Sequence, residues 1–368
     1  MTRILHVSQP VDAGVAVVLA ELAEYQHSTG WDVHVACPPE GWLVDRLAAN
    51  AIPHHSWRAS RSPGPSSLAE ARQLRSMIDD LRPDVVHLHS SKAGLAGRLA
   101  LRGSVPTVFQ PHAWSFHALT GTMATASTLW ERLAIRWTDL VVAVSGGELD
   151  EGRSHGINPV RSVVVPNGVD LQRYAPVDRA QARARLGLAE GPLAVCLGRL
   201  ARQKGQDRLV ALWPQVRALV PDAQLVLVGD GPDAASLREA AGDGVVLAGP
   251  TSTPQDWYAA ADLVVMPSRW EGMALVPLEA MACARTVVGF DVTGLREAID
   301  DAGAVVPQDD SAALAAEVAR RLADPQLAAA EGARGRQRAV TSYDRTITVS
   351  STAQAITELV SSLSRRAA

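Results

Sequence analysis

Two glutamates, Glu271 and Glu279, lie eight residues apart in a stretch that is otherwise mostly apolar. Burying an unpaired carboxylate is costly, so such a pair is more typical of a binding site than of a packed core. Gly272 lets the backbone approach a ligand closely, and Pro277 suits the first turn of a helix that carries Glu279. The free N–H groups of that turn could bind an anion. The alternative is a surface helix with two unrelated glutamates.

Two cations follow the apolar run at residues 193–197, which is typical of a buried strand. Arg199 and Lys204 would then lie in a strand-to-helix loop, and ligands of open α/β sheets bind at the carboxyl ends of strands. Only Lys92 and Lys204 are lysines among the 35 basic residues. Where arginine is the usual cation, a lysine indicates a compact charge for a phosphate, unless the two were left by chance.

The elements that must position these residues alternate between strand and helix. Short apolar runs predict strands at residues 3–8, 32–37, 85–89, 107–110, 140–144, 162–166, 193–197, 224–229, 245–248, 263–266, 286–290 and 304–306. Helices are predicted at residues 15–28, 67–81, 93–101, 128–138, 147–155, 179–186, 207–220, 233–241, 256–261, 278–284, 311–323 and 345–365. This alternation is typical of α/β proteins with doubly wound parallel sheets.

Length and composition narrow the class of protein. A chain of 368 residues is too long for one ordinary core, so we expect two domains. A net charge of −4 gives no reason to expect a nucleic-acid partner. Cys37, Cys196 and Cys283 are widely spaced beside apolar runs, which favours reduced core residues over disulfides or metal ligands. We find no signal peptide and no apolar run of about 18 residues, and therefore expect a cytoplasmic protein.

Three sequence blocks, in this order and at this spacing, resemble a known family of enzymes. The family is the large retaining glycosyltransferase family four, typified by sucrose and glycogen synthases, and the blocks are Gly198-Arg199 with Lys204-Gly205, Val228-Gly-Asp-Gly-Pro232, and Glu271-x7-Glu279. Two shorter segments usual in this family are Pro166-Asn-Gly-Val-Asp170 and Pro267-Ser268. The likeness covers nearly the whole chain and is strongest in residues 160–310. One block alone would be a weak signal, and together they are a strong one.

The resemblance implies two Rossmann-like domains that face each other across a cleft, the GT-B fold. Residues 1–170 would form an acceptor-binding domain, completed by a C-terminal helix at 346–368 that crosses back to it. Residues 171–191 would be a linker with a short helix. Residues 192–345 would bind a nucleotide sugar.

The resemblance also assigns the donor diphosphate. Arg199 and Lys204 would neutralise the charge that grows on the leaving group. The backbone N–H groups of Leu275 and Val276 would lie near the phosphates. Asp230 is expected to close a tight turn rather than to bind a ligand.

The sugar and the ribose would contact the two-glutamate segment. Glu271 would face the donor sugar near its 3-hydroxyl and contribute to catalysis. Backbone N–H groups of Gly272, Met273 and Ala274 would bind the same sugar. Glu279 would accept hydrogen bonds from the ribose hydroxyls.

The chemistry implied is transfer with retention of the anomeric configuration, by front-face attack assisted by the departing phosphate. Neither glutamate is then a nucleophile. The acid and nucleophile of a glycosidase are the alternative, but a hydrolase has no diphosphate for Arg199 and Lys204 to hold. We expect no cofactor and no metal, because the chain has no Asp-x-Asp pair and the two cations can replace a divalent ion.

The acceptor side rests on fewer residues. The family usually has two adjacent glycines after the first strand, and this chain keeps only Gly14, so contact of that loop with the donor phosphate stays open. His112 stands where the family carries a histidine near the reacting sugar, and it could bind a sugar hydroxyl or assist the transition state. A lone histidine is otherwise more often structural. His87 and His89 alternate on a strand and are expected in the core.

Two further residues are candidates for the acceptor. Lys92, at a helix N-terminus, could meet a phosphate, for example of a polyprenyl-diphosphate sugar, and this stretch resembles exopolysaccharide and cell-envelope members of the family. An ordinary helix capped by Ser90 or Ser91 is the alternative. Trp114 could stack on an acceptor ring. Residues 122–138 could form a surface-seeking amphipathic helix, which leaves peripheral association with the inner face of a membrane open.

We therefore expect a retaining, metal-independent glycosyltransferase that moves a hexosyl group from a UDP sugar, or next from GDP-mannose. The acceptor would be a hydroxyl of a saccharide, a lipid-linked saccharide or a small natural product. A nucleotide-sugar 2-epimerase shares the scaffold, and a two-lobed sugar-binding protein would be non-catalytic. Neither explains the cations and the two glutamates together. The bias to arginine and alanine indicates a GC-rich bacterial genome.

Overall fold

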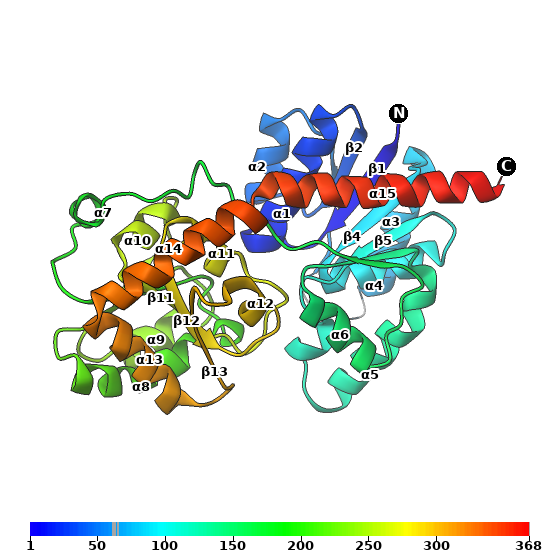
Figure 1. Cartoon of the computed structure of the whole chain (residues 1–368). Helices are drawn as coiled ribbons and strands as arrows, with labels where there is room; N and C mark the ends of the chain where they lie inside the picture. The colour runs from blue at the N-terminus through cyan, green and yellow to red at the C-terminus, as the bar shows by residue number, and fades with distance from the viewer. Residues whose placement is uncertain (61–63, 65, 368) are drawn as a thin grey trace. The chain divides into compact units, whose positions relative to one another are not determined.

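The computed structural model describes residues 1–60, 64 and 66–367. The chain divides into two compact units, each built around its own sheet (Figure 1). Unit 1 comprises Met1–Asn167 and Thr346–Ala368, and unit 2 comprises Gly168–Arg345.

Unit 1 contains a parallel sheet whose described strands run in the order β3-β2-β1-β4-β5-β6-β7. The strands are β1 (Arg3–Ser8), β2 (Asp32–Cys37), β3 (His54–Ser56), β4 (Val85–His89), β5 (Thr107–Gln110), β6 (Leu140–Ala143) and β7 (Ser162–Val164). Every residue of β4 is buried, as expected for a parallel strand covered on both faces.

Helices cover both faces of this sheet. They are α1 (Ala13–Ser28), α2 (Trp42–Ala49), α3 (Ser67–Leu81), α4 (Ser90–Leu101), α5 (Gly121–Ala134), α6 (Gly146–Ser154) and α15 (Arg345–Ala367), with 3-10 turns at Ser115–Ala118 and Ile135–Trp137. Ile4 and Val85 pack in one core with α1, α2 and α15, whereas their neighbours Leu5 and Val86 pack in a second core with α3 and α4. The C-terminal helix therefore returns to unit 1, as predicted (Figure 1).

Unit 2 contains a second parallel sheet, with its described strands in the order β10-β9-β8-β11-β12-β13. The strands are β8 (Leu193–Leu197), β9 (Gln224–Val228), β10 (Val245–Gly249), β11 (Leu263–Met266), β12 (Thr286–Phe290) and β13 (Gly303–Val306). Its helices are α7 (Arg179–Leu186), α8 (Gln206–Leu219), α9 (Ala234–Ala240), α10 (Pro254–Ala260), α11 (Leu275–Ala282), α12 (Leu295–Ile299), α13 (Ser311–Ala323) and α14 (Pro325–Ser342), with a 3-10 turn at Arg202–Lys204.

The observed elements confirm the predicted doubly wound α/β fold, and every predicted strand is present within two residues of its expected bounds. The prediction missed β3, α2, α12 and α14. Strand β3 has only three residues and no apolar run. Helix α14 begins with Pro325 after Asp324, whose carboxylate caps two backbone N–H groups, but its alanines and glycines give a weak apolar pattern.

Residues 171–191, expected to be a linker, belong to unit 2. Helix α7 lies in this segment, and its Ala182 is buried with Val195 and Val226 of the second sheet. The segment therefore covers one face of that sheet.

Two other expectations concern the burial of the cysteines and the length of apolar helices. Cys37, Cys196 and Cys283 are buried free thiols, as predicted, and burial raises the pKa of each to about 12. Within the described part of the chain, no helix combines the length and the hydropathy that crossing a bilayer requires.

In each sheet the chain starts at an inner strand and adds strands toward one edge. It then returns and adds the remaining strands on the other side of the first one. The reversal falls between β1 and β4 in unit 1, and between β8 and β11 in unit 2. In open α/β sheets the crevice at the carboxyl ends of such a strand pair is the usual ligand site. These two places position the residues described next.

Candidate functional site

In unit 2, the loops after β8 and β11 meet at the reversal point. Gly205 has a φ of +70°, and a Cβ atom added to it would lie 2.0 Å from the carbonyl oxygen of Pro267. Only glycine allows this approach, which brings the β8 loop against the end of β11. As a result, Lys204 Nζ lies 2.6 Å from Glu271 Oε1.

The carboxylate of this pair is the more buried partner. Side-chain exposure is 8 % for Glu271 and 24 % for Lys204. The Ser268 hydroxyl also donates a hydrogen bond to Glu271 Oε1, at 2.8 Å. Glu271 is thus fixed by two donors, while the ammonium group keeps access to solvent and to a further anion.

Arg199 supplies a second cation in the same loop. Its backbone carbonyl accepts a hydrogen bond from Gln206 Nε2 at 3.1 Å. Its guanidinium group is half-buried, and among the described residues it has no hydrogen bond or ion pair of its own. A cation held in this way is suited to bind an anionic ligand.

Glu279 lies in α11 and is partly buried. Tyr258 Oη donates a hydrogen bond to Glu279 Oε2 at 2.7 Å. Burial raises the pKa of Glu279, and hydrogen bonds from Tyr258 and Tyr174 oppose that rise. The carboxyl group is therefore held by phenol donors rather than by a cation.

The loop before α11 is tightly packed. Gly294 has a φ of +80°, and an added Cβ atom would lie 2.1 Å from the carbonyl oxygen of Gly272. Met273 is buried, and Ala274 caps the helix without a side-chain hydrogen bond. The helix begins at Leu275, three residues earlier than predicted, so Leu275 and Val276 place their N–H groups in its first turn. Gly272, Met273 and Ala274 form the preceding loop.

In unit 1, His112 follows β5 in a strained turn. His112 and Ala113 have φ angles of +55° and +93°, which residues other than glycine rarely adopt. Glu148 holds the turn, because its carboxylate accepts hydrogen bonds from the N–H groups of Ala113 at 2.6 Å and Val144 at 2.8 Å. Burial raises the pKa of Glu148 to about 7.

The sequence analysis missed Glu148, although a signal for it exists. Ser145-Gly-Gly-Glu148 has the pattern of a capping box. The Ser145 hydroxyl accepts a hydrogen bond from the Glu148 N–H at 3.0 Å, as that pattern predicts. The side chain of Glu148 then reaches Ala113, which lies 35 residues earlier in the chain and could not be inferred from the pattern.

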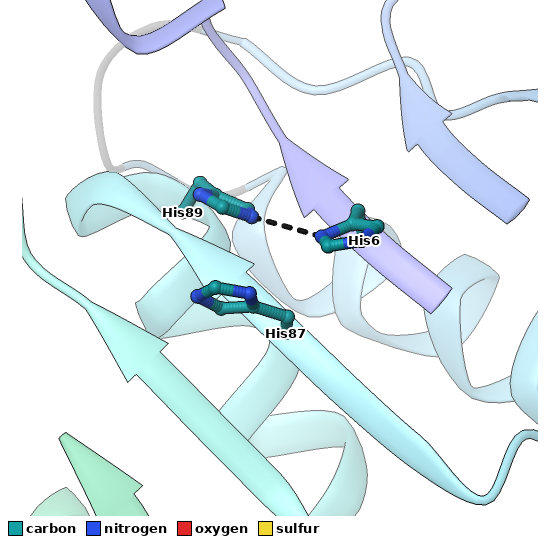
Figure 2. A group of neighbouring side chains, drawn as sticks. All are labelled: His6, His87 and His89. Atoms are coloured by element: carbon teal, nitrogen blue, oxygen red, sulfur yellow. Dashed lines mark hydrogen bonds between the residues drawn. The ribbon is translucent and has the colours of Figure 1, made fainter. Parts of the chain in front are cut away.

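His112 also belongs to a group of buried histidines. His112 Nε2 lies 3.3 Å from His89 Nδ1, and His89 Nε2 lies 3.1 Å from His6 Nδ1. His6 and His87 are register partners on β1 and β4. Figure 2 shows the rings of His6, His87 and His89 gathered on adjacent strands. Sequence alone did not reveal this group because its members come from separate elements.

These histidines are held neutral. Burial lowers the pKa of His6 to about 4 and that of His112 to about 3. Burial lowers the pKa of His87 and of His89 well below 6.5. Ring nitrogens of His6, His87 and His89 lie within 4.8 Å of one another, a spacing that could also suit a metal ion. His87 and His89 are fully buried, as predicted.

Trp114 occupies a different place from the one expected. Its exposure is 3 %, its ring lies among Phe109, Phe116 and Gly152, and its indole N–H donates to the Glu148 carbonyl at 2.7 Å. The expectation that it stacks on an acceptor ring is corrected, because the ring is part of the core of unit 1.

Lys92 is also buried and forms an ion pair within unit 1. Its ammonium group lies 2.6 Å from Glu70 Oε2, and both side chains are 4 % exposed. A ligand phosphate would have to displace this buried carboxylate, so the position does not support a phosphate role. Gly14 lies in the first turn of α1, at the carboxyl end of β1.

Comparisons with known proteins identify similar sequences along most of the chain. A family model described as "Glycosyltransferase Family 4" matches residues 13–173, and one described as "Glycosyl transferases group 1" matches residues 191–324. D-inositol 3-phosphate glycosyltransferase 1 of Catenulispora acidiphila is 34 % identical over 348 residues, which cover 84 % of this chain and 82 % of that protein.

Two further similarities are to a mannosyltransferase and to a solved structure. The GDP-mannose-dependent alpha-(1-6)-phosphatidylinositol monomannoside mannosyltransferase of Mycolicibacterium smegmatis is 39 % identical over 197 residues, which cover 49 % of this chain and 52 % of that protein. The crystal structure of Anabaena HepE in complex with UDP-glucose has a TM-score of 0.83 and 21 % identity, covering 97 % of this chain and all of that one. At this identity, the second similarity concerns the fold alone.

Proposed function

The chain belongs to glycosyltransferase family four, and from this premise we propose that it transfers a hexosyl group with retention of configuration and without a metal ion. The donor is a nucleotide-diphosphate sugar, with UDP sugars first and GDP-mannose second. The acceptor is a hydroxyl of a saccharide, a lipid-linked saccharide or a small natural product. The named donor of the Mycolicibacterium relative supports GDP-mannose, whereas the preference for UDP sugars rests on their being the commoner donors of the family.

One observation carries the proposal. Lys204 and Glu271 form an ion pair at the point where the strand order reverses, and its ammonium group is partly exposed while its carboxylate is buried. When a diphosphate arrives, the exposed ammonium group gains an anionic partner, and Ser268 keeps Glu271 in place. Arg199 brings a second positive charge. The two cations stabilise the charge that develops on the departing diphosphate, which is the role a divalent ion has elsewhere.

The rest of the donor lies along α11. Leu275 and Val276 direct first-turn N–H groups toward the phosphates, where the helix dipole favours negative charge. Gly272, Met273 and Ala274 bind the sugar. These five residues are consecutive in the chain, across the loop and the first turn of α11.

Two carboxylates complete the donor site. Glu279, oriented by Tyr258, accepts hydrogen bonds from the ribose hydroxyls. Glu271, held at Oε1 by Lys204 and Ser268, accepts one from a sugar hydroxyl, and in the front-face attack implied by the family it is not a nucleophile.

Unit 1 contributes His112, which hydrogen-bonds a hydroxyl of the transferred sugar. Gly14, at the start of α1, approaches the donor phosphate. Helix α5 supports contact with a membrane surface, because Met123, Leu129 and Leu133 are 55 %, 56 % and 44 % exposed. Flotation with anionic vesicles tests this contact, and loss of flotation in Leu129→Ser would support it.

The experiment that tests the donor site is a thermal-shift panel of nucleoside diphosphates, with and without chelator. A ligand that binds only the folded state at about 100 times its Kd adds roughly 2.7 kcal/mol of stability. We expect a shift with one diphosphate that survives chelator and disappears in Lys204→Ala. In Lys204→Gln the charge is lost but a donor for Glu271 remains, so this variant separates binding from folding.

Arg202→Ala is the matched control. Arg202 lies in the same 3-10 turn and is exposed, with its guanidinium group 5.7 Å from the Trp270 ring. This variant should keep the shift. A shift that requires a metal ion, or one that persists in both Lys204 variants, would contradict the proposal.

A further inference from the structure

A continuous series of polar contacts runs through unit 1 from Gln26 to His112. Gln26 Oε1 lies 2.7 Å from His6 Nε2, His6 Nδ1 lies 3.1 Å from His89 Nε2, and His89 Nδ1 lies 3.3 Å from His112 Nε2. Gln26, His6 and His89 are 0 % exposed, whereas His112 is only partly buried. The series therefore starts in the core of unit 1 and ends at the partly buried ring of His112.

With the side-chain oxygen of Gln26 facing His6, the proton positions along the series follow from one another. A neutral imidazole has one N–H donor and one lone pair, and a carbonyl oxygen only accepts. Gln26 Oε1 therefore requires the proton of His6 on Nε2, which leaves His6 Nδ1 to accept from His89 Nε2. His89 Nδ1 must then accept from His112 Nε2, and the lone pair of His112 lies on Nδ1.

We propose that Gln26, His6 and His89 are positioning residues that hold His112 as the Nε2–H tautomer, so that its Nδ1 atom accepts a hydrogen bond from a sugar hydroxyl. This inference rests on the proposed function of His112, and it adds which ring nitrogen donates a hydrogen bond and which accepts one. A lone pair at Nδ1 suits a hydroxyl, which can donate, and repels a phosphate oxygen, which cannot. The series thus selects the sugar rather than the diphosphate as the partner of His112.

The backbone and the ring of His112 are fixed from different sides. Glu148 accepts from the Ala113 N–H and so holds the left-handed turn. That contact leaves the ring free to rotate about its side-chain bonds. His89 supplies the second anchor, since its hydrogen bond to Nε2 restricts that rotation.

His87 offers an internal control. Its ring lies beside that of His89, with centroids 3.9 Å apart and ring planes inclined at 33°, and it is equally buried on the same strand. Neither of its ring nitrogens is hydrogen-bonded to His6, His89 or His112, so it stands outside the series (Figure 2). Replacing His87 disturbs the same part of the core without breaking any contact of the series.

A metal ion held by His6, His87 and His89 is the competing explanation. An ion needs a lone pair from each ring, whereas both nitrogens of His6 and both of His89 already have hydrogen-bond partners. Metal binding and the proton series therefore exclude each other, and the experiment can separate them.

The test compares two amide variants of His89. Asparagine places its carbonyl oxygen near the position of Nδ1, so His89→Asn keeps an acceptor for His112 and loses His6. Glutamine reaches toward the position of Nε2, so His89→Gln keeps the contact with His6 and loses His112. Both changes remove the same ring from the same site, so a purely structural role would affect them alike.

Two readouts are needed. Imidazole nitrogen chemical shifts in the full-length protein, assigned with His112→Ala, report which nitrogen of His112 carries the proton. Steady-state kinetics of transfer report kcat and KM separately, and melting temperatures confirm folding. We expect the Nε2–H signature of His112 in the wild type, His87→Phe and His89→Asn, and its loss in His89→Gln with a roughly 10- to 100-fold fall in kcat.

Three results would overturn the inference. They are an Nδ1–H tautomer in the wild type, equal behaviour of the two amide variants, and one equivalent of bound metal that disappears in His87→Phe. Failure of the proposed function looks different, because His112→Ala would then transfer sugar at the wild-type rate while the tautomer signature of the wild type stayed intact.

Discussion

The two sheets share one topology but use opposite chemistry where their strand order reverses. Unit 2 places charged groups there, Lys204 against Glu271. Unit 1 places neutral rings there, and all ten histidines of the chain lie within its bounds. The scaffold therefore sets where polar residues gather, while the residue types decide whether the place handles charge or neutral hydrogen bonds.

The backbone is held differently as well. In unit 2, Gly205 adopts a positive φ without steric cost. In unit 1, His112 and Ala113 adopt positive φ angles although both have Cβ atoms, and Glu148 compensates. Gly205 is required because two loops approach each other closely there. The strained turn at His112 instead serves to orient the histidine ring.

The largest expected effect removes the charge from unit 2. Lys204→Gln should lower kcat for release of nucleoside diphosphate from the donor about 100- to 1000-fold, since a preorganised charge on the leaving group is lost. Arg202→Ala should stay within about twofold of the wild type. Similar losses in both variants would mean that the net charge of the loop matters rather than Lys204 itself.

Lowering the pH should destabilise unit 1 more than unit 2. Burial lowers the pKa of His6 and His112 to about 4 and about 3, so the unfolded chain, which titrates near 6.5, binds more protons. The stability that these two histidines contribute is therefore fully present above about pH 6.5 and falls toward pH 4, by up to about 1.4 kcal/mol per pH unit for each histidine.

Hydrogen exchange at pH 7 and pH 5, corrected for the intrinsic rate, measures this difference. Peptides of β1 and β4 should lose protection, and those of β8 and β11 should keep it. Equal loss in both sheets would show that the buried histidines do not set the acid response.

Glu148 acts in the opposite direction within unit 1. Burial raises its pKa to about 7, so its contribution to stability is present below its unfolded value of 4.5 and is lost as pH rises through 7. Glu148→Gln, which cannot ionise, should therefore gain stability relative to the wild type between pH 5 and pH 8. Urea unfolding across this range measures the gain, and a constant difference between the proteins would argue against a titrating Glu148.

A smaller effect is expected at Glu279. Tyr258→Phe removes the phenol donor at 2.7 Å and should cost about 1.5 kcal/mol, roughly tenfold in affinity for the nucleoside diphosphate. Because the pKa of Glu279 would then rise further, the loss should be greater at the lower of two pH values. Calorimetric titration at both values checks this, and unchanged affinity would remove Glu279 from the ribose site.

The sequence predicted unit 2 better than unit 1, and the reason is physical. Arg199, Lys204, Glu271 and Glu279 lie in short motifs beside strands whose apolar runs are unmistakable. The contact between Lys204 and Glu271 then follows from the pairing of β8 with β11.

In unit 1 the decisive contacts join residues that are distant in sequence. His6 and His89 are 83 residues apart, and Lys92 meets Glu70 only because α3 and α4 pack together. Trp114 shows the same limit, since its position two residues after His112 carries no information about its burial. Motifs predict local chemistry, whereas buried networks depend on strand register.

The donor site proposed for unit 2 is tested most directly by differential hydrogen exchange. The ligand is the nucleoside diphosphate that gives the largest thermal shift, in the presence of chelator. We expect protection in unit 2 at residues 198–206 and 268–282, and no such protection there in Lys204→Ala. Protection confined to other segments, or protection that appears only with a divalent metal, would contradict the donor site proposed for unit 2.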